Sequence, residues 1–318
     1  TSTLFPYTTL FRSTNLYFGD KLLCSNPTEV SFETIKTKND TYFKIENYNE
    51  MSPFFMTIVS DVDFWLFISS TGGLTAGRKT PENALFPYVT DDKIHDSSET
   101  TGSHTLLIVS DGDKNYLWKP FSRHNSNVYR ITRNLYKNTI GNKIMFEEIN
   151  RDLNLTFRYT WKTSNQYGLI KESELINTSG KTLRVKLLDG IRNIMPYGVD
   201  AMLQNMRSTL VDGYKRSELV EKYALGIFTL SSIISDKAEP SESLKATTVW
   251  SMGLFQPTIL LSESQIRAFE NNKSIDTEQD VKGRRGAFYV STLVELRPQE
   301  SKDWVIVSEL HQSAAKIE

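Results

Sequence analysis

The sequence predicts a mainly β protein: a large antiparallel two-sheet sandwich with a few short helices. Three observations predict this fold class. Apolar residues recur at every second position, short turn sequences separate the apolar runs, and helical periodicity is sparse. Because strand follows strand without a regular helix between them, we expect antiparallel sheets rather than a doubly wound parallel sheet.

The clearest strand covers residues 153–162. In this segment, LNLTFRYTWK, every odd position is apolar or aromatic and every even position is polar. A strand with one buried and one solvated face requires this alternation. Similar alternation or compact apolar runs predict further strands at 30–35, 42–45, 54–59, 64–69, 105–109, 128–136, 143–149, 167–176, 182–188, 223–231, 246–252, 288–296 and 304–308.

Turns and helices complete the predicted framework. Turn chemistry, supplied by Asp, Asn, Ser and Gly, is found at 110–113, 177–180, 189–190 and 212–213. A weak helical pattern covers 262–271, and the charged segment 272–285 is expected to be an exposed excursion. The best helical pattern covers 198–210, where one apolar face would consist of Val199, Met202, Leu203, Met206 and Leu210.

The first residues are expected to be foreign to the protein. Residues 3–13, TLFPYTTLFRS, match the translation of a common short-read sequencing adapter. We therefore treat residues 1–13 as a technical artefact and exclude them from the fold. Roughly 305 residues remain, which suits one large sandwich domain over 14–310.

Composition excludes several classes of function. The 37 basic and 38 acidic residues nearly balance, which gives no argument for nucleic acid or an anionic membrane as a partner. The most apolar stretch, 54–69, is interrupted by Asp61 and Asp63, so no membrane span is expected. The single Cys24 excludes an internal disulfide framework and a cysteine-rich zinc site. Compartment stays open between the cytoplasm and the periplasm of a bacterium.

Three segments resemble the N-terminal β-supersandwich of cellobiose-phosphorylase-like enzymes and related helical-barrel glycosidases and phosphorylases. The first is 65–78, WLFISSTGGLTAGR, followed by NALFPY at 83–88. The second is 172–185, ESELINTSGKTLRV, which is similar to a strand, Asn-x-Ser-Gly turn and strand unit of those sandwiches. The third is 296–307, LRPQESKDWVIV, which looks like their turn before a closing strand.

This resemblance implies a galactose-mutarotase-like supersandwich over 14–310. Residues 311–318 would begin a linker to a missing C-terminal helical-barrel domain. That barrel would carry the catalytic carboxylates, so no catalytic residue is expected in this chain. The implied partners are an oligosaccharide or glucan, the barrel domain and, in a homodimer, a second copy. No cofactor is implied; inorganic phosphate would be a co-substrate if the whole enzyme is a phosphorylase.

The segment 72–102 is the candidate sugar-facing loop. Aromatic faces stack on sugar rings, and charged or polar side chains bind hydroxyls. A divalent cation held by the acidic cluster 91–96, or a merely solvated loop, are the alternatives for part of this segment. The candidate substrate-binding residues are Arg78, Phe86, Tyr88, Asp92 and His95.

Other catalytic patterns are weak. The carboxylate pairs Asp61/Asp63 and Asp111/Asp113 flank apolar runs at i, i+2, where Asp commonly caps turns, so we favour that interpretation over glycoside hydrolysis. No Gly-x-Ser-x-Gly elbow is present.

The leading functional hypothesis is a non-catalytic sandwich fragment of a glycoside phosphorylase or hydrolase, with carbohydrate-binding and domain-packing roles. The alternatives are a stand-alone aldose-epimerase-like enzyme, with a His acid and a Glu base, and a carbohydrate-binding or adhesion module without catalysis.

Overall fold

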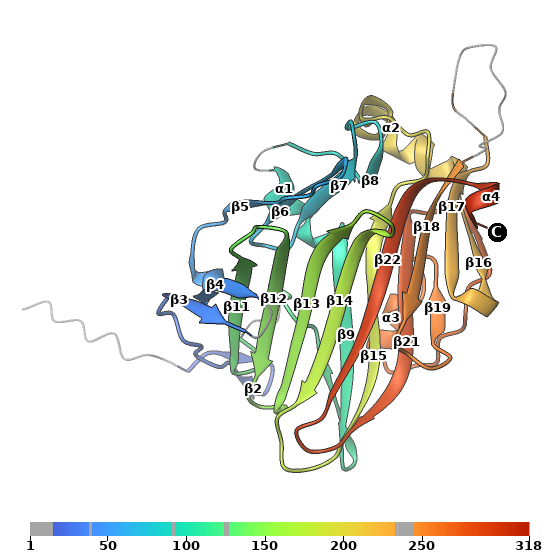
Figure 1. The fold of residues 1–318 in the computed structure, drawn as a ribbon. Helices are drawn as coiled ribbons and strands as arrows, with labels where there is room; N and C mark the ends of the chain where they lie inside the picture. Colours follow the sequence, from blue (N-terminus) through green and yellow to red (C-terminus); the bar gives the residue numbers. More distant parts are fainter. Residues whose placement is uncertain are drawn as a thin grey trace, which may run out of the picture.

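The computed structural model describes residues 15–37, 40–90, 93–123, 127–232, 234 and 245–317. It is mainly β, as predicted from the sequence. Two large antiparallel sheets face each other, and a four-stranded sheet lies beside one end of them (Figure 1). The adapter-like residues 3–13 lie outside the described part of the chain.

The larger sheet has eleven strands. Their order is β20 (Asp280–Lys282), β16 (Lys215–Val220), β17 (Leu225–Leu230), β18 (Lys245–Met252), β22 (Ser301–Ser313), β14 (Gly168–Asn177), β13 (Leu155–Ser164), β12 (Lys143–Asn150), β11 (Ile131–Asn138), β4 (Thr41–Glu46) and β3 (Ser31–Lys36).

The two other principal sheets are smaller. The facing sheet has the order β10 (Lys114–Trp118), β9 (Gly102–Asp111), β15 (Leu183–Ile194), β21 (Gly286–Leu296) and β19 (Thr258–Leu260). The four-stranded sheet has the order β5 (Phe55–Ile58), β6 (Phe64–Ser69), β7 (Leu74–Arg78) and β8 (Ala84–Phe86).

The remaining elements are short. A two-stranded hairpin joins β1 (Tyr17–Phe18) to β2 (Lys21–Leu22). None of the helices in the described ranges has the length and apolar character that a bilayer span requires. The α-helices are α1 (Lys93–Asp96), α2 (Ala201–Tyr214), α3 (Ile266–Glu270) and α4 (Ala314–Ile317), and the 3₁₀ helices are Tyr48–Glu50, Ser97–Glu99 and Glu221–Tyr223.

Three sequence-based predictions of local structure need correction. The candidate loop 72–102 instead contains β7, β8 and α1. The two short strands were not predicted because small residues such as Ala76 and Gly77 give no recognisable alternation of apolar and polar positions. Asp189-Gly190 is not a turn but the interior of β15, and Asp212-Gly213 lies inside α2.

The predicted helix at 198–210 exists as α2, which is kinked at Arg207, but its apolar face is only partly buried. Val199 and Val211 pack inside, whereas Met202, Met206 and Leu210 are exposed. The N-terminus of α2 is capped by Asp200, whose carboxylate accepts the Leu203 amide at 2.6 Å. Helix propensity and N-capping therefore stabilise α2 more than burial of the predicted apolar face does.

The main core lies between the two large sheets. The odd positions of β13, Phe157, Tyr159 and Trp161, are buried there, as the alternation predicted. Their neighbours in the core include Val185 and Leu187 of the facing sheet. The even positions of β13 point to the other face of the sheet, where Arg158 pairs with Glu147 and Glu174.

A polar cluster lies inside this core. Lys171 of β14 and Asp189 of β15 are both fully buried, and Lys171 Nζ lies 2.5 Å from Asp189 Oδ1. Thr105 Oγ1 donates to Asp189 Oδ1 at 2.6 Å. Ser173 Oγ and Trp304 Nε1 donate to Oδ2 at 2.9 and 2.7 Å. One carboxylate therefore ties β14 and β22 of the large sheet to β9 and β15 of the facing sheet.

We predict that Asp189→Ala lowers the free energy of unfolding by about 3–5 kcal/mol, because it leaves the Lys171 ammonium buried without its counter-charge. Burial already lowers the pKa of Lys171, and the carboxylate opposes that shift. Urea unfolding followed by tryptophan fluorescence measures the loss.

The control is Asp113→Ala in the exposed turn after β9, which should change stability by less than about 0.5 kcal/mol. Equal free energies of unfolding for the two variants would show that the buried pair does not stabilise the core.

Candidate functional site

The structure separates the predicted site residues. Arg78 ends β7, opposite Phe64, and His95 lies at the other end of the β6–β7 hairpin, beside Ser69. At a rise of about 3.3 Å per strand residue, the two ends of this hairpin lie roughly 15 Å apart. Phe86 is fully buried against Trp161, where it offers no surface to a sugar. Asp92 lies outside the described residues.

His95 and Tyr88 serve local packing. His95 Nδ1 lies 2.6 Å from Ser69 Oγ, and the His95 carbonyl accepts a hydrogen bond from Thr71. Tyr88 is half-buried, edge-on to Trp65 at 5.7 Å between ring centroids.

Within the described residues, no three His, Cys, Asp or Glu side chains group closely enough to hold a metal ion; Asp91 and Asp92 fall outside that range.

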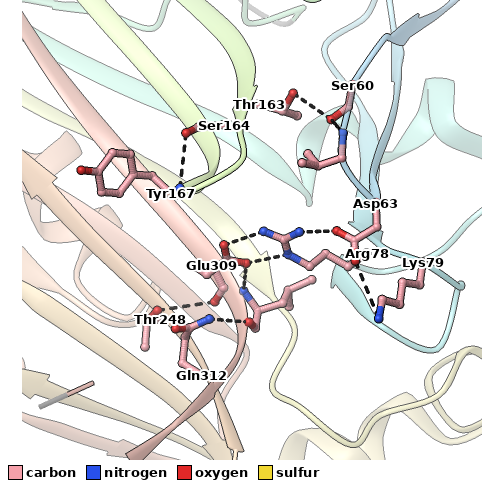
Figure 2. Close-up of polar contacts among 12 residues, drawn as sticks. Ser60, Asp63, Arg78, Lys79, Thr163, Ser164, Tyr167, Thr248, Glu309 and Gln312 are labelled. Carbon is pink, nitrogen blue, oxygen red and sulfur yellow. Dashed lines mark hydrogen bonds and ion pairs between the residues drawn. The ribbon is translucent and has the colours of Figure 1, made fainter. Parts of the chain in front are cut away.

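Arg78 forms an ion pair between the four-stranded sheet and the eleven-stranded sheet. Its Nε and Nη2 donate to Glu309 Oε1 and Oε2 of β22 at 2.8 and 2.6 Å, a bidentate pair. Its Nη1 donates to Asp63, and its guanidinium lies over the Phe64 ring at 4.8 Å. Hydrogen bonds to Glu309 come first among the causes that raise the pKa of Arg78. Figure 2 shows Arg78 between Asp63 and Glu309.

Glu309 is held by a third donor. The Leu310 amide donates to Glu309 Oε1 at 2.7 Å. The carboxylate fits because the nearest residue of β14 is Gly168, whose backbone φ is +74°. A Cβ there would lie 2.4 Å from the Ser308 carbonyl and 3.0 Å from Glu309 Oε2. Glycine at this position thus leaves room for the buried carboxylate.

A groove of about 550 Å³ borders Glu309 on the large sheet. Three aromatic side chains line it: Tyr167 before β14, Tyr223 before β17 and Trp250 of β18. Tyr167 is 48% and Tyr223 63% exposed, although Lys222 Nζ lies over the Tyr223 ring, 5.0 Å from its centroid. The polar lining comes from Gln166, Thr248, Glu309, Gln312 and Lys316.

Hydrogen bonds restrain two residues of the groove. Gln312 Nε2 donates to the Leu310 carbonyl at 2.7 Å, and the Tyr167 amide donates to Ser164 Oγ at 3.3 Å. Figure 2 shows Tyr167, Thr248 and Gln312 around Glu309. Exposed aromatic faces beside fixed amide and carboxylate groups can stack on a sugar ring and hydrogen-bond its hydroxyls.

Sequence reasoning did not find this groove. Its residues come from four separate segments, and the predicted strand 304–308 ended just before Glu309. The available signal was the pair Tyr167 and Tyr223, aromatic residues that each begin a predicted strand.

No protein-family model and no curated protein matches this sequence. Solved structures resemble it in shape. A bacterial glucoamylase complexed with acarbose matches over 84% of this chain and 34% of its own, at 10% identity and a TM-score of 0.46. A putative aldose 1-epimerase from Escherichia coli K12 matches over 82% and 99%, at 9% identity and 0.45. A galactose mutarotase-like protein from Clostridium acetobutylicum matches over 90% and 100%, at 10% identity and 0.42.

This chain spans about a third of the glucoamylase, and about a third of a polysaccharide lyase that it also matches. At these TM-scores the likenesses carry no argument about function. The fold assignment, a mainly β antiparallel supersandwich, rests on the sheets of the chain itself.

We predict that Arg78→Lys lowers the free energy of unfolding by roughly 1–3 kcal/mol, because lysine cannot form the bidentate contact and leaves part of the buried Glu309 carboxylate unsatisfied. Chemical unfolding measures the change. The neighbouring Lys79→Met removes only an exposed ammonium 4.0 Å from Asp63 and should have almost no effect. A larger loss in Lys79→Met than in Arg78→Lys would contradict the assignment.

Proposed function

We propose that this chain is a non-catalytic carbohydrate-binding sandwich of a glycoside phosphorylase or hydrolase, and that the groove beside Glu309 binds an oligosaccharide or glucan. The observation that carries this proposal is the groove itself. It places Tyr167, Tyr223 and Trp250 around a polar lining, in about 550 Å³. That volume falls in the range of ligand sites, about 300–1,000 Å³.

The hydrogen bonds of Glu309 support a positioning role for this residue. Its carboxylate accepts three hydrogen bonds, two of them from a guanidinium. These donors engage both carboxylate oxygens, so the side chain is held in one orientation. Glu309 is therefore proposed to orient the groove, while the aromatic rings supply the contact with the sugar.

An exposed apolar stripe supports a domain-packing role. Met202 and Met206 lie one turn apart in α2 and are 69% and 77% exposed, and Leu210, beyond the kink at Arg207, is 43% exposed. Contiguous apolar side chains on a surface are typical of contact sites for another protein surface. We propose that this stripe packs against the helical-barrel domain of the whole enzyme.

An aldose-epimerase-like activity is a second candidate function, and one observation supports it. His311 and Glu309 both belong to β22, so an imidazole and a carboxylate lie close together on one strand. The His311 ring packs edge-on against Tyr197 at 4.8 Å, and burial lowers the pKa of His311.

We predict that Tyr167→Ala and Trp250→Ala each weaken binding of gluco-oligosaccharides about tenfold. Stacking of one aromatic ring on a sugar ring, with the area that it buries, contributes roughly 1–1.5 kcal/mol. Isothermal titration against a panel of linkages measures this. The matched control is Phe255→Ala, which removes a ring that is 83% exposed and outside the groove. Absence of heat across the whole panel, or equal loss in the Phe255 variant, would rule out the groove as the site.

We also predict that the chain does not accelerate mutarotation of common aldoses above the buffer rate, because Glu309 is fully engaged by its donors. Polarimetry on glucose and galactose measures the rate. A rate above buffer that Glu309→Gln abolishes would replace the binding proposal with the epimerase one.

A further inference from the structure

A second cavity, of about 320 Å³, lies at the five-stranded sheet, and its residues are distinct from those of the groove. We call it the His104 cavity. Its lining comes from the start of β9, the end of β15, the segment after β10 and the region of α3. The polar and charged lining includes Ser98, Glu99, His104, Lys119, Arg192, Glu263 and Glu270.

Hydrogen bonds fix the state of His104. The carboxylate of Glu263 only accepts, so the Tyr289 hydroxyl donates to its Oε1 at 3.4 Å and accepts from His104 Nδ1 at 2.9 Å. Nδ1 then carries the imidazole proton and Nε2 carries a lone pair. Burial lowers the pKa of His104 well below its ordinary value, so the ring is neutral at pH 7. Within the described ranges, no group hydrogen-bonds Nε2.

Gly190 makes this contact possible. It pairs with His104 on one side and with Tyr289 on the other. A Cβ at Gly190 would lie 2.4 Å from the Tyr289 ring. The absent side chain lets Tyr289 lean across β15 to reach His104, with the two rings edge-on at 5.8 Å.

Two further polar atoms of the lining have no partner among the described residues. Arg192 is 7% exposed; its Nη2 donates to the Ser98 carbonyl at 2.9 Å, but its Nε has no acceptor. The Ser98 hydroxyl is also buried without a partner. Both atoms are covered by protein, so they make the wall of the cavity polar without contacting a molecule inside it.

The charges of the lining indicate the class of ligand. Lys119 pairs with Glu270 at 2.6 Å, and Arg192 lies 3.5 Å from Glu263. With Glu99, the lining has three carboxylates and two cationic side chains. It therefore has no excess positive charge, which a phosphate would require. Phe121 and Tyr159 add aromatic surface. A neutral polyol satisfies this set, because its hydroxyls both donate and accept and its C–H face packs on aromatic rings.

We propose that the His104 cavity is a second binding site, for a neutral polyol the size of one sugar ring, whose hydroxyl donates to His104 Nε2. The cavity volume is at the small end of ligand sites, about 300 Å³, which excludes an extended chain. This site is independent of the glucan groove.

The test is NMR on the chain labelled with ¹⁵N at histidine, titrated with glucose, galactose, mannose and myo-inositol up to about 10 mM. The free protein should show His104 as the neutral tautomer protonated at Nδ1. One of the four polyols should shift the Nε2 resonance. No shift with any of them would overturn the proposal, as would a shift caused by inorganic phosphate alone.

Two variants distinguish this site from the groove. His104→Phe keeps a ring but removes Nε2, and should weaken binding of that polyol about tenfold, as loss of one hydrogen bond predicts. Tyr167→Ala should leave it unchanged. Loss of polyol binding in Tyr167→Ala and not in His104→Phe would overturn the second site and leave the groove proposal standing. If His104→Phe fails to fold, the titration of the unmodified chain still decides.

Discussion

The carboxylate of Asp189 is the constraint on which the rest of the structure depends. A buried carboxylate is tolerated only if its oxygens are fully paired. Asp189 meets this requirement by accepting from Lys171, Thr105, Ser173 and Trp304. Since these donors belong to both large sheets, one register between the sheets satisfies it. A purely apolar core would allow the sheets to slide, because apolar contact is non-directional.

The same physical logic recurs at the edge of the sandwich. Arg78 crosses from the four-stranded sheet to Glu309 of the large sheet, and both side chains are largely withdrawn from water. Fixing Glu309 also fixes the strand end that carries Gln312 and borders Tyr167. An ion pair between sheets therefore borders the groove, and the aromatic rings come from β18 and from the residues before β14 and β17.

Glycines decide where polar groups fit between strands. Gly168 leaves room for Glu309, and Gly190 leaves room for Tyr289 to reach His104. In both cases the missing Cβ lies next to a buried polar side chain of another strand. Gly190 follows Asp189 directly, so consecutive positions on β15 serve the two faces of the sheet. Asp189 accepts hydrogen bonds in the core, and Gly190 lies between His104 and Tyr289.

The sequence by itself determined the mainly β class, most of the strands and the buried face of β13, because two-residue alternation is a local property that burial imposes directly. It could not separate the Asp189-Gly190 turn from a strand interior, because the same dipeptide serves a hairpin or a buried acceptor according to its long-range partners. Of the predicted site, Arg78 lies beside the groove, while Phe86 is in the core. Only the tertiary structure placed Tyr167, Trp250 and Glu309 together, because a groove between strands far apart in the chain has no sequence period.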